Sequence, residues 1–175
     1  MNEAAYEAIR TRRVTRAMSA EPIDPQAFDA VIHAARWAPN AGNRRLQPVI
    51  GVTDPELLRM LRAVAPGMFP RPQAAAVICI DVERAVGYGF RPDAPGLYVD
   101  VGTTAATLLL AAHAVGLASC PTTSFSRAAA GRLLNLKPGV TAQMIVCLGH
   151  PADVQPPPMG GWTRAAQGKP RSGAG

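Results

Sequence analysis

The sequence has few lysines, few aromatic residues and few cysteines, and each shortage argues against a class of protein. Only Lys137 and Lys169 are lysines, so the net charge of +6 rests on arginine. Aromatic residues make up 5% of the chain, and no recognition motif accompanies the arginines, which disfavours nucleic-acid binding. Cys79, Cys120 and Cys147 are too few for a disulfide scaffold, and we expect core thiols in a reducing compartment.

The familiar local signatures of catalysis are also missing. The chain has no G-x-G-x-x-G, Walker A or G-x-S-x-G sequence. His33, His113 and His150 stand far apart without neighbouring ligands, so we expect no metal site. If the chain is an enzyme, a cofactor therefore carries the difficult chemistry.

Nothing in the sequence predicts export or a membrane span. The N-terminus places acidic residues before its arginines and has no apolar run, unlike a signal peptide. The longest apolar helix candidate, near 105–118, is short and contains His113. We therefore expect a soluble cytoplasmic protein that does not contact a membrane.

The length and composition indicate one globular domain with a real core. The chain has 175 residues, of which 48% are hydrophobic. Its basic balance fits a polyanionic partner, such as a phosphorylated cofactor, but genomic base composition explains an arginine bias equally well.

Hydrophobic spacing and helix-capping residues predict a chain with more helix than strand. The predicted class is α/β or α+β, because the few strands are separated by helices. Asp24-Pro25 and Asp54-Pro55 mark two helix starts, and residues 84–97 read as an exposed loop before a helix capped by Asp100. That helix is apolar almost all round, which predicts a place in the core or in a subunit interface. The predicted helices cover residues 3–11, 25–37, 55–64, 100–115 and 126–134, and the predicted strands cover 49–53, 75–81 and 142–148.

Four segments, each weak alone, follow one another in a recognisable order. They are Arg12-Arg13-Val14-Thr15-Arg16; Ala38-Pro39-Asn40-Ala41-Gly42-Asn43 with Gln47-Pro48; Asp100-Val101-Gly102 with Ala114-Val115-Gly116-Leu117; and Leu133-Leu134-Asn135-Leu136-Lys137-Pro138-Gly139 with Leu148-Gly149-His150-Pro151. Together they resemble the FMN-dependent nitroreductase superfamily over about residues 3–151. The resemblance implies an α+β sandwich with a small, mostly antiparallel central sheet flanked by helices, a buried central helix and an intertwined homodimer. It divides the chain into an FMN-binding domain, 1–151, and a Pro/Gly-rich basic tail, 152–175.

The resemblance assigns the first segment to the flavin phosphate. Guanidinium groups bind phosphate bidentately and stay charged at any working pH. By the family pattern, Arg12, Arg13 and Arg16 contact the phosphate and the ribityl chain, while Val14 stands where serine is common. Arg12 and Arg16 are expected to converge while Arg13 points elsewhere. The alternative is a solvated basic helix end.

By the same resemblance, Pro39, Asn40 and Asn43 reach the flavin of the partner subunit. The family reads Asn-x-Gln-Pro-Trp here, whereas residues 43–49 hold two extra positions and end in Val49. The alternative for this segment is a simple helix-ending turn.

Two further segments complete the expected site. The turn Pro121-Thr122-Thr123-Ser124 is implied to present backbone amides to the N5 edge of the flavin, although polarity there is also explained by Ser126 as a helix cap. Lys169 and Arg171 match a C-terminal basic pair that folds back to the phosphate. Arg164 competes for that role, and a loose basic tail fits equally well.

The resemblance implies an FMN oxidoreductase. NAD(P)H would reduce the flavin, and a nitroaromatic, quinone or enone acceptor would then reoxidise it in a ping-pong cycle. The departures at Val14 and Val49 keep open a non-catalytic member that binds FMN or another phosphorylated ligand. A remote alternative is nucleic-acid binding, which predicts a strongly salt-dependent affinity.

Overall fold

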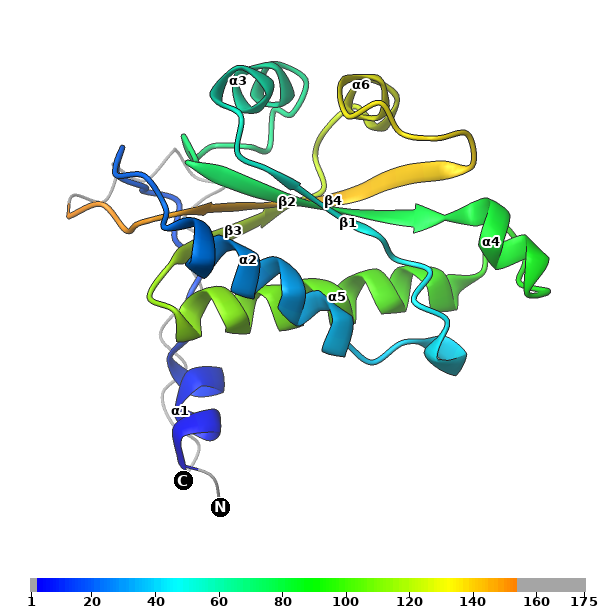
Figure 1. The fold of residues 1–175 in the computed structure, drawn as a ribbon, viewed down its shortest axis with the longest axis horizontal. Helices are drawn as coiled ribbons and strands as arrows, with labels where there is room; N and C mark the ends of the chain where they lie inside the picture. Colours follow the sequence, from blue (N-terminus) through cyan, green and yellow to red (C-terminus); the bar gives the residue numbers. More distant parts are fainter. Residues whose placement is uncertain (1–2, 154–175) are drawn as a thin grey trace, which may run out of the picture.

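The computed structural model describes residues 3–153 (Figure 1). The expected residues Lys169, Arg171 and Arg164, and nearly all of the tail 152–175, lie outside them. In chain order the elements are α1 (Glu3–Thr11), α2 (Pro25–Ala34), η1 (Ala35–Trp37), η2 (Ala41–Asn43), β1 (Val49–Val52), α3 (Pro55–Ala63), β2 (Ala74–Asp81), α4 (Val82–Gly87), α5 (Pro95–Ala114), β3 (Ala118–Thr122), α6 (Arg127–Leu133) and β4 (Val140–Gly149).

The strands form one antiparallel sheet in the order β1-β2-β4-β3. The two central strands align Ala76 with Val146 and Val77 with Ile145, and a bulge follows at Ile78/Cys79. Every residue of β2 before Asp81 is buried, which confirms the expectation that this continuous apolar run is covered on both faces.

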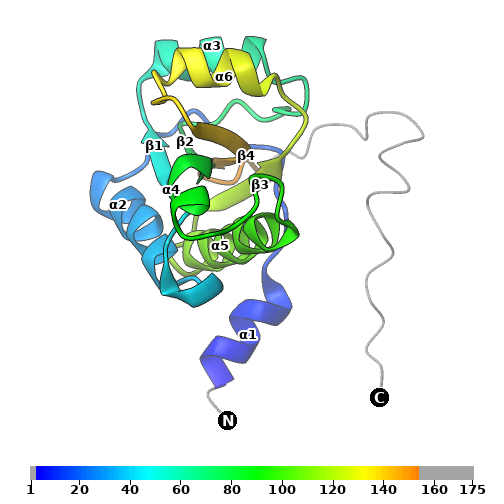
Figure 2. The same ribbon diagram turned by 90° about the vertical axis from the view of Figure 1, so that its right-hand side faces the viewer.

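Helices cover both faces of the sheet (Figure 2). On one side α2 and α5 bury Phe28 and Leu108 against the sheet, and on the other α3 and α6 bury Leu61 and Ala130. The α+β sandwich with its buried central helix is therefore confirmed. The prediction of a small, mostly antiparallel sheet is also confirmed, and every strand pair within residues 3–153 is antiparallel.

Two predicted helix starts are confirmed in detail. The carboxylate of Asp24 accepts a hydrogen bond from the Gln26 amide at 3.2 Å, and that of Asp54 accepts one from the Leu57 amide at 2.7 Å. The predicted helix 25–37 instead ends as an α-helix at Ala34, and a short 3-10 turn carries the chain on to Trp37.

The expected exposed loop 84–97 is confirmed only for residues 88–94, because helices occupy both of its ends. Asp81 caps α4 by accepting a hydrogen bond from the Arg84 amide at 3.0 Å, and α5 begins at Pro95. Asp100 therefore lies inside α5 rather than capping it, and the N-cap residue is Ala94. Proline is favoured in the first turn of a helix, so Pro95 starts the element that a count of proline and glycine assigns to a loop.

Helix α5 is longer than expected, and by length and composition alone it could cross a membrane. In this fold it packs on the sheet instead: Leu97, Leu108 and Ala112 are buried on its inner face. Its outer face exposes Val99, which is 63% accessible, and the backbone of Gly102. The helix thus reads as a core element with one uncovered apolar side.

Strand β3 was not predicted from the sequence. Its residues are mostly buried, but Pro121 interrupts the pattern of a typical strand. Because β3 is an edge strand paired only with β4, a proline here breaks no ladder on a second side.

The three cysteines are free, buried thiols. Burial raises the pKa of Cys79 to about 11 and that of Cys147 to about 12, and it also raises the pKa of Cys120. All three thiols are therefore protonated near neutral pH, although Cys120 and Cys147 face each other across β3 and β4.

We expect iodoacetamide at about pH 8 to leave the folded protein unmodified, because only an accessible thiolate reacts quickly. Mass spectrometry of the protein labelled in guanidinium should show alkylation of Cys79, Cys120 and Cys147. Rapid labelling of any of them in the folded chain would contradict the burial described above.

Candidate functional site

The arginine segment is held where α5 ends and β3 begins. The Thr11 hydroxyl lies 2.9 Å from Nε2 of His113, near the C-terminus of α5. The Thr15 amide donates to the carbonyl of Ser119 at 3.0 Å. These contacts fix residues 11–15 at both ends, so the chain leaves α1 in a defined path rather than as a free helix end.

The three arginines of this segment have different surroundings. Arg13 folds back and donates from Nη1 to the carbonyls of Arg10 and Arg12, at 2.7 and 2.9 Å. In contrast, Nη1 of Arg12 is buried and has no hydrogen-bond partner within residues 3–153. Arg16 is half-buried and has no ion pair among these residues. Burial raises the pKa of the Cys120 thiol, and the positive charge of Arg16 has a smaller, opposing effect that lowers that pKa.

A buried guanidinium N–H without a partner is costly, by about 1–3 kcal/mol or more for a charged group. Buried polar groups without a hydrogen-bond partner are rare in folded proteins, and a bound ion is one common reason for them. An anion beside Arg12 would supply the missing acceptor, and Arg16 adds a second unpaired positive charge on the same segment. The donor set therefore fits a phosphate.

The predicted turn 121–124 is only partly a turn, because Pro121 and Thr122 are the last two residues of β3. A glycine that sequence reasoning missed braces the chain where it leaves the strand. The Gly67 amide donates to the carbonyl of Ser124 at 2.9 Å. A Cβ on Gly67 would lie 2.2 Å from Oγ1 of Thr122, so no other residue fits without displacing the turn. Thr122 itself is buried and accepts from the Ser124 amide at 3.3 Å, whereas Thr123 is exposed. These contacts hold the turn in one conformation beside Pro121.

The segment with Pro39, Asn40 and Asn43 lies at the other end of α5. The Asp100 carboxylate accepts from the Ala41 amide at 3.0 Å. The Thr103 hydroxyl donates to the carbonyl of Pro39 at 2.7 Å. These two bonds tie the segment to the N-terminal half of the helix.

The Asn40 side chain forms its hydrogen bonds within its own segment. Its side-chain oxygen accepts from the Arg45 amide at 2.9 Å, and its side-chain nitrogen donates to the carbonyl of Ala38 at 3.1 Å. Asn43 is exposed at the end of η2, with a left-handed φ of 54°. The side chain expected to meet a flavin is therefore largely committed to shaping the loop.

One chain does not bring the predicted residues together. The segment 12–16 is bonded to β3 through the Thr15 amide, whereas the Pro39–Asn43 segment is bonded to Asp100 and Thr103 near the start of α5, and Figure 1 shows β3 at the other end of that helix. At 1.5 Å per residue, the anchors Asp100 and His113 are about 20 Å apart along the helix. The chain therefore presents two separate half-sites.

The three histidines have separate surroundings. His113 is engaged with Thr11, His33 is exposed beside Trp37, and the His150 carbonyl accepts from the Ser19 amide at 2.9 Å. In the part of the chain that the structure describes, no three His, Cys, Asp or Glu side chains gather in a way that could hold a metal ion.

These features define an α+β sandwich in which the segment bonded to an edge strand holds a buried guanidinium nitrogen without a partner among residues 3–153. The chain belongs to the nitroreductase family, whose sequence pattern matches residues 9–89 and 72–150. That family comprises NAD(P)H- and FMN-linked oxidoreductases, so the expectation of an enzyme family of this kind is confirmed.

Similar proteins agree with the family assignment. A protein of Archaeoglobus fulgidus, provisionally named NADH dehydrogenase/NAD(P)H nitroreductase, is 30% identical over 158 residues, which cover 86% of this chain and 87% of that protein. The NADPH:FMN oxidoreductase of Vibrio harveyi, solved with NAD+, is 26% identical with a TM-score of 0.73, over 89% of this chain and 74% of that one. A structure from Parabacteroides distasonis shares the fold, with a TM-score of 0.76 and 22% identity over 91% and 94% of the two chains.

Replacing Asp100 with alanine should loosen the 38–43 segment, because the Ala41 amide loses its acceptor. The expected cost is about 1–3 kcal/mol in the free energy of opening that segment. Hydrogen exchange at the Ala41 amide measures it directly. Asp100→Asn is the matched control, since it keeps an acceptor oxygen and should retain most of the protection. Equal exchange in the wild type and Asp100→Ala would show that the carboxylate is not the anchor.

Proposed function

We propose that this protein binds FMN and passes reducing equivalents from NAD(P)H to an electron-poor organic acceptor. The observation that carries the proposal is the buried, unpartnered Nη1 of Arg12, on the same short segment as Arg16, which has no ion pair among the described residues. A phosphate dianion between them satisfies both guanidinium groups, and FMN carries such a phosphate. Family membership supports the choice of FMN over other phosphorylated ligands.

Within this proposal the three arginines have different roles. Arg12 and Arg16 hold the phosphate, because their guanidinium groups have no other partner among the described residues. Arg13 shapes the path of the chain through its bonds to the carbonyls of Arg10 and Arg12. Val14 is exposed and brings no hydroxyl group, so the phosphate depends on the two arginines more than a serine-containing site would.

A homodimer would complete the site. The two half-sites lie about 20 Å apart along α5 in one chain, which is too far for one flavin to use both. The outer side of α5 exposes Val99 at 63%, and α1 exposes Tyr6 and Ile9 at 56% and 62%. Apolar surface of this kind is typical of a subunit contact. A second copy packed there would bring its Pro39–Asn43 segment toward the first copy's β3.

Bound FMN would supply the hydride chemistry, and the protein would supply position and shelter. The chain at 121–124 would contact the edge of the flavin ring. The Pro39–Asn43 segment of the second copy would line the exposed face of the ring, where NAD(P)H and the acceptor bind. NAD(P)H and the acceptor would occupy that face one after the other, as in a ping-pong mechanism. Nitroaromatics, quinones and enones fit because they are planar and electron-poor.

The remaining parts of the proposal concern the ends of the chain and its setting. Residues 1–151 would form the FMN-binding domain, with 152–175 as a basic tail whose Lys169 and Arg171 add to the phosphate site. We propose a cytoplasmic protein that acts on small molecules and not on nucleic acid.

The absorbance spectrum tests catalysis directly. The purified protein, reconstituted with FMN, should be yellow and should bleach when NADPH or NADH is added without oxygen. Colour should return when a quinone is added, because the acceptor reoxidises the flavin. A protein that holds FMN but never bleaches would instead be a non-catalytic member. Failure to bind FMN at all would overturn the proposal.

Single substitutions test the phosphate assignment. Arg12→Ala and Arg16→Ala should each weaken FMN binding about tenfold or more, since hydrogen bonds to charged groups contribute about 1.5–3 kcal/mol. Quenching of FMN fluorescence on binding measures the affinity. Arg10→Ala is the matched control, because Arg10 pairs with Glu7 on the exposed side of α1. Unchanged affinity in both test variants would refute the assignment.

A further inference from the structure

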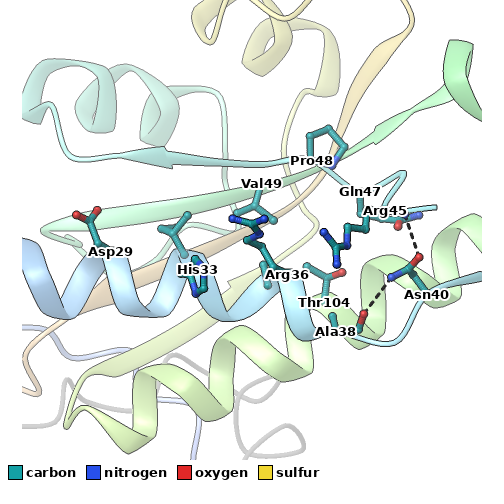
Figure 3. A pocket seen from close by; sticks show the side chains of 12 residues that line it. Asp29, His33, Arg36, Ala38, Asn40, Arg45, Gln47, Pro48, Val49 and Thr104 are labelled. Atoms are coloured by element: carbon teal, nitrogen blue, oxygen red, sulfur yellow. Dashed lines mark hydrogen bonds between the residues drawn. The ribbon is translucent and has the colours of Figure 1, made fainter. Parts of the chain in front are cut away.

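A cavity of about 490 Å³ lies between α2 and the segment that leads into β1 (Figure 3). It is separate from the arginine segment at residues 12–16 but touches the Pro39–Asn43 half-site through Asn40. The lining residues are Asp29, Ile32, His33, Ala35, Arg36, Ala38, Asn40, Arg45, Gln47, Pro48, Val49 and Thr104.

The cavity combines apolar walls with positive charge. Ile32, Pro48 and Val49 contribute apolar surface to the lining. The side chains of Arg36 and Arg45 extend into the same space (Figure 3). Neither guanidinium forms an ion pair within residues 3–153. The one acidic side chain in the lining, Asp29, stands at the far end on α2 (Figure 3). The cationic end is therefore open to an anion.

The backbone of Arg45 lies in an unusual conformation at the edge of the cavity. Arg45 has a φ of 51°, in the left-handed region that non-glycine residues rarely adopt. The hydrogen bond from its amide to the Asn40 side chain maintains this geometry. Strain that the surroundings enforce is common where a side chain is aimed at a ligand.

The neighbouring Arg44 provides a contrast. Its guanidinium lies over the ring of Tyr88, with 4.5 Å between the guanidinium carbon and the ring centroid, and it is not part of the cavity lining. Two adjacent arginines thus have different positions: one packs on an aromatic ring, and the other lines the cavity.

We propose that this cavity binds a planar, partly apolar molecule through its anionic group, held by Arg36 and Arg45. The inference rests on the proposed function, because Asn40 would place the cavity next to the flavin face of a second copy and make its ligand a substrate. Paired guanidinium groups favour phosphate or carboxylate, and the apolar wall favours an attached ring. The anion comes either from the 2′-phosphate of NADPH or from a carboxylate on the acceptor.

Binding measurements with Arg36→Gln and Arg45→Gln test the proposal. Calorimetry compares NADP+ with NAD+, and 4-nitrobenzoate with 4-nitrobenzamide, on FMN-loaded protein. In one of the two pairs, each variant should lose about tenfold or more in affinity for the anionic member, as expected for a lost charged hydrogen bond. The other member should bind as it does to the wild type. Glutamine keeps the side-chain stem as far as Cδ and stays polar without a charge, so the fold should survive, and unchanged circular dichroism verifies this.

Arg44→Gln is the matched control, because it removes the same charge one residue away without touching the cavity. A selective loss for NADP+ identifies the nucleotide as the source of the anion, and a selective loss for 4-nitrobenzoate identifies the acceptor. Equal losses in Arg44→Gln would reveal a general effect of charge and overturn the proposal, as would unchanged affinities in both test variants. FMN binding and bleaching are measured separately, so a failure here leaves the flavin assignment standing.

Discussion

The packing of α5 across the sheet is the constraint on which the rest of the molecule depends. Its buried side, with Leu97 and Leu108, fixes the helix against β2 and β4. The two ends of the helix are then fixed anchors: Asp100 binds the amide of Ala41, and His113 lies against Thr11. Each polar segment of the candidate site is located by one of these anchors, so the apolar core sets the spacing of the chemistry.

Arginine carries nearly all of the positive charge, yet its residues are not equivalent. What separates them is the local backbone: Arg13 turns onto carbonyls at the end of α1, and Arg44 packs over Tyr88. Arg12 retains a buried nitrogen without an acceptor among the described residues, while Arg45, whose backbone has a left-handed φ, lines a cavity. Net charge indicates an anionic partner only weakly, whereas a buried donor without an acceptor gives a specific place to test for one.

The sequence predicted those elements whose signals are local. Asp24 and Asp54 cap helices because a side-chain acceptor followed by proline favours a helix start, and the apolar run of β2 required burial on both faces. The start of α5 and the edge strand β3 were not predicted, because proline usually indicates a loop. Here Pro95 begins a helix and Pro121 lies in a strand. The candidate residues were named from motif order, but Gly67, Arg36 and Arg45 take their roles from tertiary contacts that no spacing in the sequence reveals.

The separation of the half-sites has a thermodynamic consequence for the proposed dimer. If one flavin contacts Arg12 of one copy and the Pro39–Asn43 segment of the other, only the dimer offers the full set of contacts. FMN would then bind the dimer more tightly than the monomer, and by linkage it would stabilise the dimer by the same free energy. The apparent FMN affinity would therefore rise with protein concentration until the dimer is fully formed. A site contained in one chain would show no such dependence, so dilution separates the two arrangements without any substitution.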